Sequence, residues 1–387
     1  MSFETLGLFN IISVTVAWSV YVLGFEFYSY SLRHIVGENT QVISSHVFNQ
    51  LIFHLAGYAL LLICSPVLVV LDFIPIALLH YFILITIFDQ VSQECFRICV
   101  ALERSQFANF IHLVKSGLWV YPLLLLPMLQ IPITIHLILG AWLLGTVAAC
   151  LLGTLKLVNL GVLSFKKVSL NVPWIKQGII VALPFLVISV SQLTMDFSDR
   201  YLIDYFLGKS EVGVYSFYYG IANVPTTLIT SVLVSQYYPR IINIFKFHTS
   251  VADRKKVIRQ FLLQCLGFAL IINVVILLCI PFLLDFIGKQ ELLDHIDLFY
   301  IMLLQVIVFS VQVVVQTVLY ARHEDKFLLY SAVSGAVLNI IVNLYLIPLI
   351  GIYGAAIATL LSMTLMLLVR LFFLQKSKHS QEKYGKV

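Results

Sequence analysis

The stretch DRYLIDYFLGKSEVGVYSFYYG, from Asp199 to Gly220, begins with a charged pair that stands at the end of a long apolar run. A second apolar run follows the stretch, and only 11% of the 387 residues of the chain are charged. Soluble domains are about one quarter charged, so a charged pair is conspicuous in this setting. The stretch therefore raises the question of which class the whole chain belongs to.

Composition answers that question. The chain is 60% hydrophobic and has a mean hydropathy of +0.99. Windows of about 20 apolar residues, long enough to cross a bilayer as a helix, recur along it between Gly, Pro and charged residues. We therefore predict an all-α polytopic membrane protein with about eleven transmembrane helices. The windows lie near 7–30, 48–70, 73–95, 107–129, 134–157, 178–205, 212–238, 261–285, 297–320, 327–348 and 352–374.

The basic residues predict the orientation of these helices. If the C-terminus is cytoplasmic, one face of the membrane collects 20 of the 24 Lys and Arg residues. Cytoplasmic loops carry such an excess because positive charge is retained during insertion. The net charge of +5 then reflects orientation and attraction to anionic lipid, and no nucleic-acid partner is needed to explain it.

An internal repeat predicts the organisation into lobes. Three segments of the first half resemble three segments of the second half in the same order, and two such halves are a common design of transporters. We predict an N-terminal lobe of five helices over 1–160, a cytoplasmic linker over 161–177, and a C-terminal lobe of six helices with a basic tail over 178–387. The paired segments are Leu6 to Trp18 with Val212 to Val224, Val100 to Phe110 with Val318 to Tyr330, and Leu126 to Pro132 with Leu346 to Gly354.

Three stretches carry a resemblance to a known family: Asp199 to Gly220, AVLNIIVNLYLIPLIGIYGAAIATLLS from Ala336 to Ser362, and QECFRICVALERSQFANFIHLVKSGLW from Gln93 to Trp119. The chain resembles the oligosaccharide-lipid flippases, the Wzx-type O-antigen and polysaccharide-export branch of the multidrug/oligosaccharidyl-lipid/polysaccharide exporter superfamily. Members usually have twelve helices and cytoplasmic termini. This sequence departs from that pattern at its front, where the first helix is missing. We expect either an upstream apolar run of about 20 residues or impaired export.

The resemblance implies a function. Such a protein flips a polyprenyl-pyrophosphate-linked oligosaccharide across the bacterial cytoplasmic (inner) membrane by alternating access, for synthesis of O-antigen, lipopolysaccharide, capsule or exopolysaccharide. Its expected partners are the lipid-linked oligosaccharide, the bilayer, a polysaccharide polymerase and a chain-length regulator. We expect no enzymatic activity, no cofactor and no metal site, since no Walker A motif, nucleophile elbow or HExxH spacing occurs. H⁺ and Na⁺ both stay open as the coupling ion.

Two alternatives remain open. A membrane-embedded polysaccharide polymerase or glycosyltransferase would use the same lipid-linked substrate, although such enzymes usually carry a sizeable outer loop and the outer loops here look short. A drug/cation antiporter of the same superfamily would need unpaired buried carboxylates.

Charged residues within apolar windows are the first candidates for the site, because a charge at lipid depth is costly and usually functional. Lys115 lies about 12 Å into its predicted helix. The family commonly has a basic residue there, which implies either a pyrophosphate contact or a lysine that snorkels to the interface. Asp196, Arg200 and Asp204 share one helical face, so Arg200 is expected to be bracketed by carboxylates at the outer mouth of a lumen or at a helix end.

Polar and aromatic residues supply the other candidates. Amides on one face of a helix either join helices or line a wet cavity suited to sugar hydroxyls. The tyrosines near Asn223 are either an interfacial belt or a stacking surface for sugar rings. The complete set of predicted lumen residues is Lys115, Asp196, Asp199, Arg200, Tyr218, Asn223, Gln305, Gln312 and Asn339.

The predicted topology can be tested at the interlobe linker. A single cysteine at Lys166 should react with a membrane-permeant maleimide in intact cells and resist an impermeant one, because the linker is predicted to be cytoplasmic. Labelling of that cysteine from outside the cell would contradict the topology.

Overall fold

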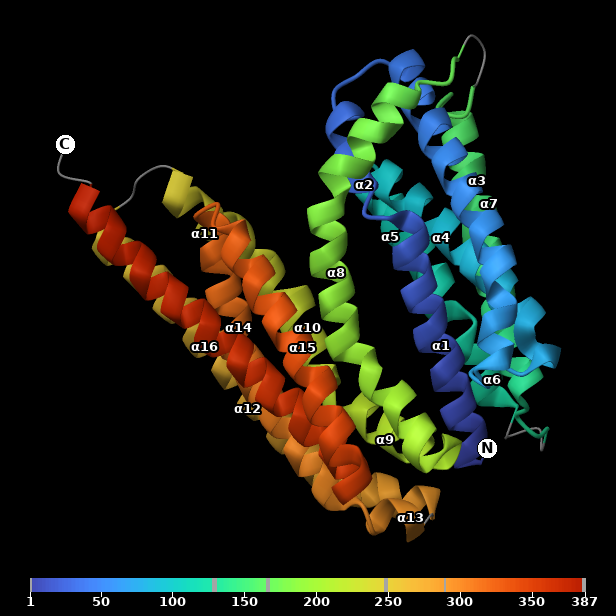
Figure 1. Cartoon of the computed structure of the whole chain (residues 1–387), viewed down its shortest axis with the longest axis vertical. Coiled ribbons are helices and arrows are strands. Elements are labelled where there is room, and N and C mark those ends of the chain that lie inside the picture. The colour runs from blue at the N-terminus through green and yellow to red at the C-terminus, as the bar shows by residue number, and fades with distance from the viewer. Residues whose placement is uncertain (1, 127–130, 165–167, 247–249, 289, 385–387) are drawn as a thin grey trace. The chain divides into compact units, whose positions relative to one another are not determined.

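The computed structural model describes residues 2–126, 131–164, 168–246, 250–288 and 290–384, and within these ranges every regular element is a helix. By its internal contacts the chain divides into two compact units, Met1–Val190 and Ser191–Val387. The division falls inside one long helix, α8 (Val172–Leu207), which contributes its first half to one unit and its second half to the other (Figure 1).

The first unit is a helical bundle in which several of the long helices begin at polar caps. Ser2 and Asn39 each accept a hydrogen bond from the backbone N–H three residues further on, which satisfies one of the free donors at a helix start. Besides the first half of α8, its elements are α1 (Phe3–Gly24), α2 (Tyr28–Ser31), the 3₁₀ turn η1 (Leu32–His34), α3 (Thr40–Val70), the 3₁₀ turn η2 (Ile76–Leu78), α4 (Leu79–Ala101), α5 (Ser105–Leu113), the π-helical turn η3 (Val114–Leu118), α6 (Val120–Leu125) and α7 (Ile135–Asn159).

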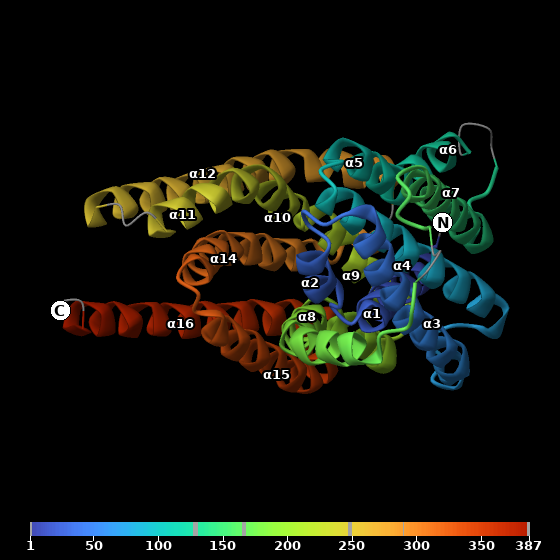
Figure 2. The ribbon, with the colours of Figure 1, turned by 90° about the horizontal axis from the view of Figure 1, so that it is seen from above.

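The second unit contains the remaining helices. Its core includes Tyr237, which stacks on Phe261 with 4.6 Å between the ring centroids. In Figures 1 and 2, α16 runs beside α14 and α15 over much of its length. The elements are α9 (Lys209–Ala222), α10 (Val224–Leu228), the π-helical turn η5 (Ile229–Val234), α11 (Ser235–Lys246), α12 (Val251–Ile287), α13 (Gln290–Leu293), α14 (Ile296–Ala321), α15 (Asp325–Ile350) and α16 (Ile352–Tyr384).

The predicted fold class is confirmed. Nine helices of the described residues are long and apolar enough to cross a membrane, or ten when Lys209–Ala222 and Val224–Lys246 count as one span bent by 40°. The predicted window 107–129 differs from the others, because it is divided among α5, η3 and α6, and residues 127–130 lie outside the described residues. Large apolar side chains face outward, for example Phe282 and Phe286 at 77% and 89% exposure, as on a surface that lipid covers.

The turns in one pair of the repeated segments share a backbone geometry. The turn between α4 and α5 places Glu103 in the left-handed region, at φ 60°, and the turn between α14 and α15 places His323 there, at φ 58°. In both turns the next residue donates its N–H to a carbonyl five residues back, at 2.8 Å for Arg104 and 3.1 Å for Glu324. The same pattern occurs outside the repeated segments, at Asp72 with φ 56°, so it is a common helix ending and the internal repeat stays a prediction. The segment Leu126 to Pro132 lies partly outside the described residues.

The boundary between the two units differs from the predicted linker at 161–177. Asn49 holds the end of that segment to α3: its amide donates to the Ser169 carbonyl at 3.2 Å, and its side-chain oxygen accepts from the Asn171 N–H at 2.6 Å. Trp174 packs against Phe27, with 5.4 Å between the ring centroids. These contacts place the described part of 161–177 in the first unit. Its cytoplasmic location stays a prediction, as does a helix ahead of Leu6.

Two glycines of α7 provide a matched test of packing in the first unit. A Cβ at Gly153 would lie 2.6 Å from the Cβ of Cys95 on α4, whereas a Cβ at Gly140 would meet nothing within 4 Å. Gly153→Ala should therefore destabilise the protein by about 1–3 kcal/mol. Gly140→Ala should be neutral or stabilise it by up to about 1 kcal/mol, because alanine favours the helix. Thermal unfolding of both variants in detergent checks this. Equal melting temperatures for the two variants would show that α4 and α7 do not approach so closely.

Candidate functional site

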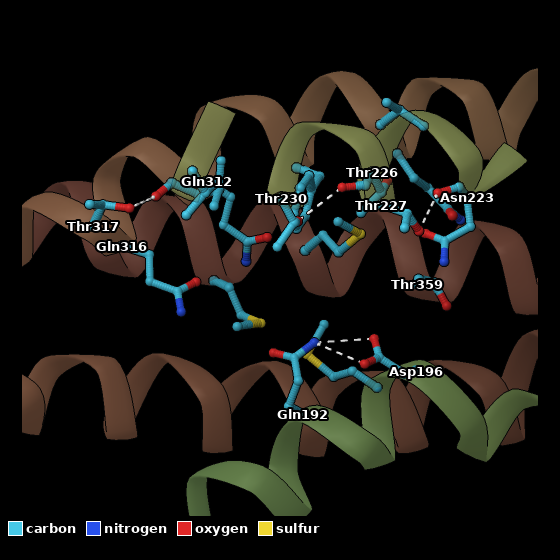
Figure 3. Close-up of a pocket in the computed structure, with 18 of the residues that line it drawn as sticks. Gln192, Asp196, Asn223, Thr226, Thr227, Thr230, Gln312, Gln316, Thr317 and Thr359 are labelled. Carbon is cyan, nitrogen blue, oxygen red and sulfur yellow. Dashed lines mark hydrogen bonds between the residues drawn. The ribbon is translucent and has the colours of Figure 1, made fainter. Parts of the chain in front are cut away.

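The second unit contains a cavity of about 870 Å³. The wall of this cavity is contributed by the second half of α8, by the helix from α9 to α11, by α14, by Leu328 of α15, and by four residues of α16 that include Arg370. Figure 3 shows polar side chains projecting into the space from three sides. A polar wall is unusual in a unit with so many apolar residues, and it identifies this cavity as the candidate site.

A stripe of hydroxyl groups forms one side of the cavity. Thr226, Thr227, Thr230 and Ser231 follow Asn223 at spacings that place them on one face of the continuous α10–η5 helix. Thr230 donates its hydroxyl to the Thr226 carbonyl at 2.9 Å, and Thr227 donates to the Asn223 carbonyl at 3.2 Å (Figure 3). Since these donors are used within the helix, the hydroxyl oxygens stay available as acceptors.

The stripe lies where the helix departs from regular α geometry. The span bends by 40° at Asn223, between α9 and α10, and widens to a π-helical turn over Ile229–Val234. Single π-helical turns inside α-helices are frequent at functional sites.

Amide side chains of α14 form another part of the wall. Gln305 donates to the Ala356 carbonyl at 2.8 Å, which ties α14 to α16 and leaves its side-chain oxygen for the cavity. Gln312 and Gln316 also line the space, and Gln316 is exposed. Amides present both a donor and an acceptor, so this side can pair with ligand hydroxyls in either sense.

The α8 side carries a carboxylate. The Gln192 amide donates to both carboxylate oxygens of Asp196, at 3.1 and 3.3 Å, and both residues face the threonines across the cavity (Figure 3). Among the described wall residues, Asp196 is the only acid and Arg370 of α16 is the only base. Four methionines complete much of the rest: Met195, Met302, Met363 and Met366.

Arg370 is buried, at 3% exposure. Its Nε donates to the Ser331 hydroxyl at 3.0 Å and its Nη1 donates to the Gln316 side-chain oxygen at 3.1 Å. Both acceptors are neutral, and within the described chain no carboxylate forms an ion pair with this guanidinium. A buried cation without a counter-ion is uncommon, because desolvation of the charge costs several kcal/mol.

The structure places four of the nine predicted lumen residues on this wall: Asp196, Asn223, Gln305 and Gln312. Tyr218 and Asn339 lie elsewhere in the second unit. Tyr218 donates its hydroxyl to the Leu292 carbonyl, and Asn339 joins α8 to α15 by accepting a hydrogen bond from Ser198 at 2.8 Å. Both residues hold helices together.

The charged pair of the opening stretch forms a buried network. Arg200 and Asp199 are 3% and 1% exposed, and Arg200 Nη1 lies 3.3 Å from Asp199 Oδ1. The Tyr215 hydroxyl donates to the other Asp199 oxygen, and the Arg200 guanidinium stacks over the ring of Tyr219 at 4.3 Å. Because Tyr219 lines the cavity, the pair supports the wall from behind and pins α8 to α9.

The prediction that Asp196 and Asp204 bracket Arg200 is therefore wrong. Arg200 bonds the backbone carbonyl of Asp196 at 2.5 Å, and its carboxylate partner is the adjacent Asp199. Asp204 pairs with Lys209, at 3.5 Å. Helical spacing identified residues on one face correctly, but it did not reveal that the long arginine side chain would turn toward α9.

Lys115 belongs to the first unit and lies in the π-helical turn η3. Its Nζ donates to Asp89 Oδ1 at 2.6 Å and to Gln93 Oε1 at 2.8 Å, both on α4. The side chain is 12% exposed. The lysine thus has a counter-ion across to α4, and the predicted pyrophosphate contact would have to compete with that ion pair.

A second buried polar network lies in the first unit. Glu94 accepts hydrogen bonds from Arg97 at 2.7 Å and from Gln50 at 2.6 Å, and the Arg97 guanidinium lies 3.7 Å from the centroid of the Tyr28 ring. Gln90 continues the network to Tyr58. The network joins α2, α3 and α4.

Sequence reasoning missed the threonine stripe and Arg370. The threonines could have been found from the spacing of hydroxyl residues after Asn223. Arg370 was counted with the basic C-terminal end, and its burial depends on contacts with α14 and α15 that no local pattern reveals. Within the described residues, no group of three or more His, Cys, Asp or Glu side chains could hold a metal ion. The expected absence of a cofactor stays a prediction.

No family model and no curated protein matches the chain. Solved structures do match. The chain resembles an inward-facing multidrug resistance MATE family transporter of the MOP superfamily, with a TM-score of 0.81 and 15% identity, covering 99% of this chain and 92% of the other. It also resembles the lipid II flippase MurJ in an inward closed conformation, with a TM-score of 0.66 and 14% identity, covering 97% and 82%. The protein thus has the fold that these two solved structures share.

The buried pair behind the wall yields a stability prediction. Arg200→Ala should destabilise the second unit by about 3–5 kcal/mol, because it leaves the Asp199 carboxylate buried without its cation. The double variant Asp199→Ala/Arg200→Ala should cost less than the sum of the single variants. Thermal unfolding of the purified variants measures both effects. If Arg200→Ala unfolded at the wild-type temperature, the ion pair would not be structural.

Proposed function

We propose that the protein is a membrane transporter that flips a polyprenyl-pyrophosphate-linked oligosaccharide across the bacterial cytoplasmic membrane by alternating access. The observation that carries the proposal is the cavity lined by amides and hydroxyls in a unit whose outer surface is apolar. Sugar hydroxyls are both donors and acceptors, and the threonine stripe and the glutamines of α14 match them in kind. A cavity of about 870 Å³ falls in the usual range of ligand sites.

The fold supports this proposal. MurJ, which shares the fold, is a lipid II flippase, and the MATE structure is that of a transporter. In the proposed mechanism the sugar head group enters the polar cavity while the polyprenyl tail stays in lipid beside apolar faces such as that of α12. We place the C-terminus in the cytoplasm, following the distribution of basic residues.

We propose transport without catalysis. An enzyme acting on the same substrate would need a folded outer segment that presents acidic or arginine side chains to the sugar. The described connections that the predicted orientation places outside are short, as at Leu71–Pro75 between α3 and η2 and at Gly351 between α15 and α16. The charges of the cavity wall are an acid on α8 and a base on α16, and no ion pair joins them.

A second candidate function is export of organic cations, and the four methionines of the wall favour it. Methionine side chains are flexible and polarisable, so they adapt to varied apolar ligands. Together with the Asp196 carboxylate they could receive a lipophilic cation. The multidrug resistance transporter of the same fold is in keeping with this candidate.

The two candidate functions differ in the role of the threonine hydroxyls: they bind the sugar in the first and are not needed for binding in the second. The double variant Thr230→Val/Gln312→Leu should reduce flipping of a polyprenyl-diphosphate-linked fluorescent sugar in proteoliposomes by about tenfold or more, because each lost hydrogen bond is worth about 1 kcal/mol. Efflux of a cationic dye should change less than twofold. Thr364→Val is the matched control, since Thr364 donates to the Leu360 carbonyl at 2.7 Å, as Thr230 does to Thr226, but lies off the wall.

If the wild-type protein transports the cationic dye but does not flip the lipid-linked sugar, the first candidate function is rejected and the second is favoured. Equal loss of sugar flipping in the control and in the double variant would show that the effect arises from helix packing.

A further inference from the structure

We infer that Arg370 is an oxyanion-binding residue of the cavity, positioned to receive an anionic group of the ligand. The inference rests on the proposed function, because it assigns a place to the anionic part of the lipid-linked head group. It begins from a guanidinium that is 3% exposed, lines the cavity, and has only neutral partners in the described chain. A charge kept in an apolar unit without a counter-ion is expected to serve a ligand.

The hydrogen bonds of Arg370 fix its orientation and leave part of it unused. Nε is bound to Ser331 on α15 and Nη1 to Gln316 on α14, so the planar group is held between two helices. Nη2 makes no hydrogen bond within the described chain. Arginine presents its donors in a rigid fork that suits the oxygens of phosphate and carboxylate. The guanidinium is therefore oriented in advance for an anion.

Gln316 extends the donor set. Because its side-chain oxygen accepts from Arg370, its amide NH₂ is left free, and Figure 3 shows this side chain at the cavity. An anion at Arg370 would thus find guanidinium and amide N–H groups together. Figure 3 also shows Gln316 and Asp196 at opposite sides of the view, so the carboxylate does not occupy the same end of the cavity.

The arrangement differs from that of three other cations in the described helices. Arg200, Arg97 and Lys115 each have a carboxylate within 3.3 Å, which fills the role that a ligand anion would play. Arg370 has a serine and a glutamine in the corresponding places. The shared chemistry of candidate ligands is an oxyanion: the diphosphate of a lipid carrier or the carboxylate of an acidic sugar. The phosphate of a bilayer lipid is the competing source of the same chemistry, and it would not be part of a transported ligand.

Binding measurements on the full chain in phosphatidylcholine nanodiscs test the inference. Farnesyl diphosphate is the anionic probe and farnesol its uncharged twin; glucuronate and nanodiscs that contain phosphatidylglycerol represent the other two sources. Arg370→Gln should weaken farnesyl diphosphate binding at least about tenfold, and farnesol binding less than about twofold. Arg370→Lys should retain more affinity for the diphosphate than Arg370→Gln, because it keeps the charge. Arg322→Gln, which removes an arginine that does not line the cavity, should change neither affinity.

Arg370-dependent binding of farnesyl diphosphate or of glucuronate supports the inference and identifies the source of the oxyanion. Dependence on Arg370 for phosphatidylglycerol alone, or equal weakening of farnesyl diphosphate and farnesol, overturns it. If Arg370→Gln does not fold, the binding of both farnesyl probes to the wild-type protein is the test, because equal affinity for farnesyl diphosphate and farnesol also overturns the inference. These measurements involve no translocation. A failed flipping assay would therefore reject the proposed function while leaving oxyanion binding at Arg370 standing.

Discussion

Polar and charged groups in this protein lie among side chains that offer few hydrogen-bond partners, and that constraint organises the structure. Asp199 has Arg200 and Tyr215, Glu94 has Arg97 and Gln50, and Lys115 has Asp89. An unpaired charge at such depth would cost several kcal/mol, so the helices that carry these residues are fixed relative to their neighbours within each unit. The networks thus provide hydrogen-bond partners for polar groups inside the apolar bundle, as caps and turns do for backbone groups at the helix ends.

The same constraint separates structural polar residues from those available to a ligand. Asn339 and Tyr218 form hydrogen bonds with neighbouring elements. Thr227 and Thr230 use their hydroxyl hydrogens within the helix and keep their oxygens as acceptors, and Arg370 keeps a donor group without a partner in the described chain. Donors and acceptors on the cavity wall that have no partner among the described residues are the physical basis for the proposed site. The methionines between these groups add an apolar, adaptable surface, so the cavity combines features of sugar-binding and drug-binding walls.

Several helices of the chain end in the same way. Glu103, His323 and Asp72 take the left-handed conformation, and the residue after each donates its N–H to a carbonyl five residues back. Such a bond satisfies a carbonyl that the end of a helix would otherwise leave without a partner. Connections of this kind let helices follow one another closely in a fold that the chain shares with solved structures of a MATE transporter and of MurJ at about 15% identity.

The sequence by itself determined the class of protein, because hydropathy follows directly from composition and helix length follows from the thickness of the bilayer. It also located most of the long helices, although α3 begins eight and α12 ten residues before the predicted windows and the window 107–129 is divided among α5, η3 and α6. It identified Asp196, Asn223, Gln305 and Gln312 as candidates because each is a polar residue among apolar neighbours. Their shared location on one cavity wall depends on which helices meet.

Only the tertiary structure decided how each polar group is used. The partner of Arg200 is the adjacent Asp199, although helical spacing favoured Asp196 and Asp204, because the side chain turns toward the aromatic rings of α9. Lys115 is neutralised by a residue of another helix, and Arg370 is not neutralised although it stands near a basic tail. Spacing along one helix fixes which face a residue occupies, but the groups facing it come from helices distant in sequence. The free energy of a buried charge depends on those groups, and they are assembled only when the bundle packs.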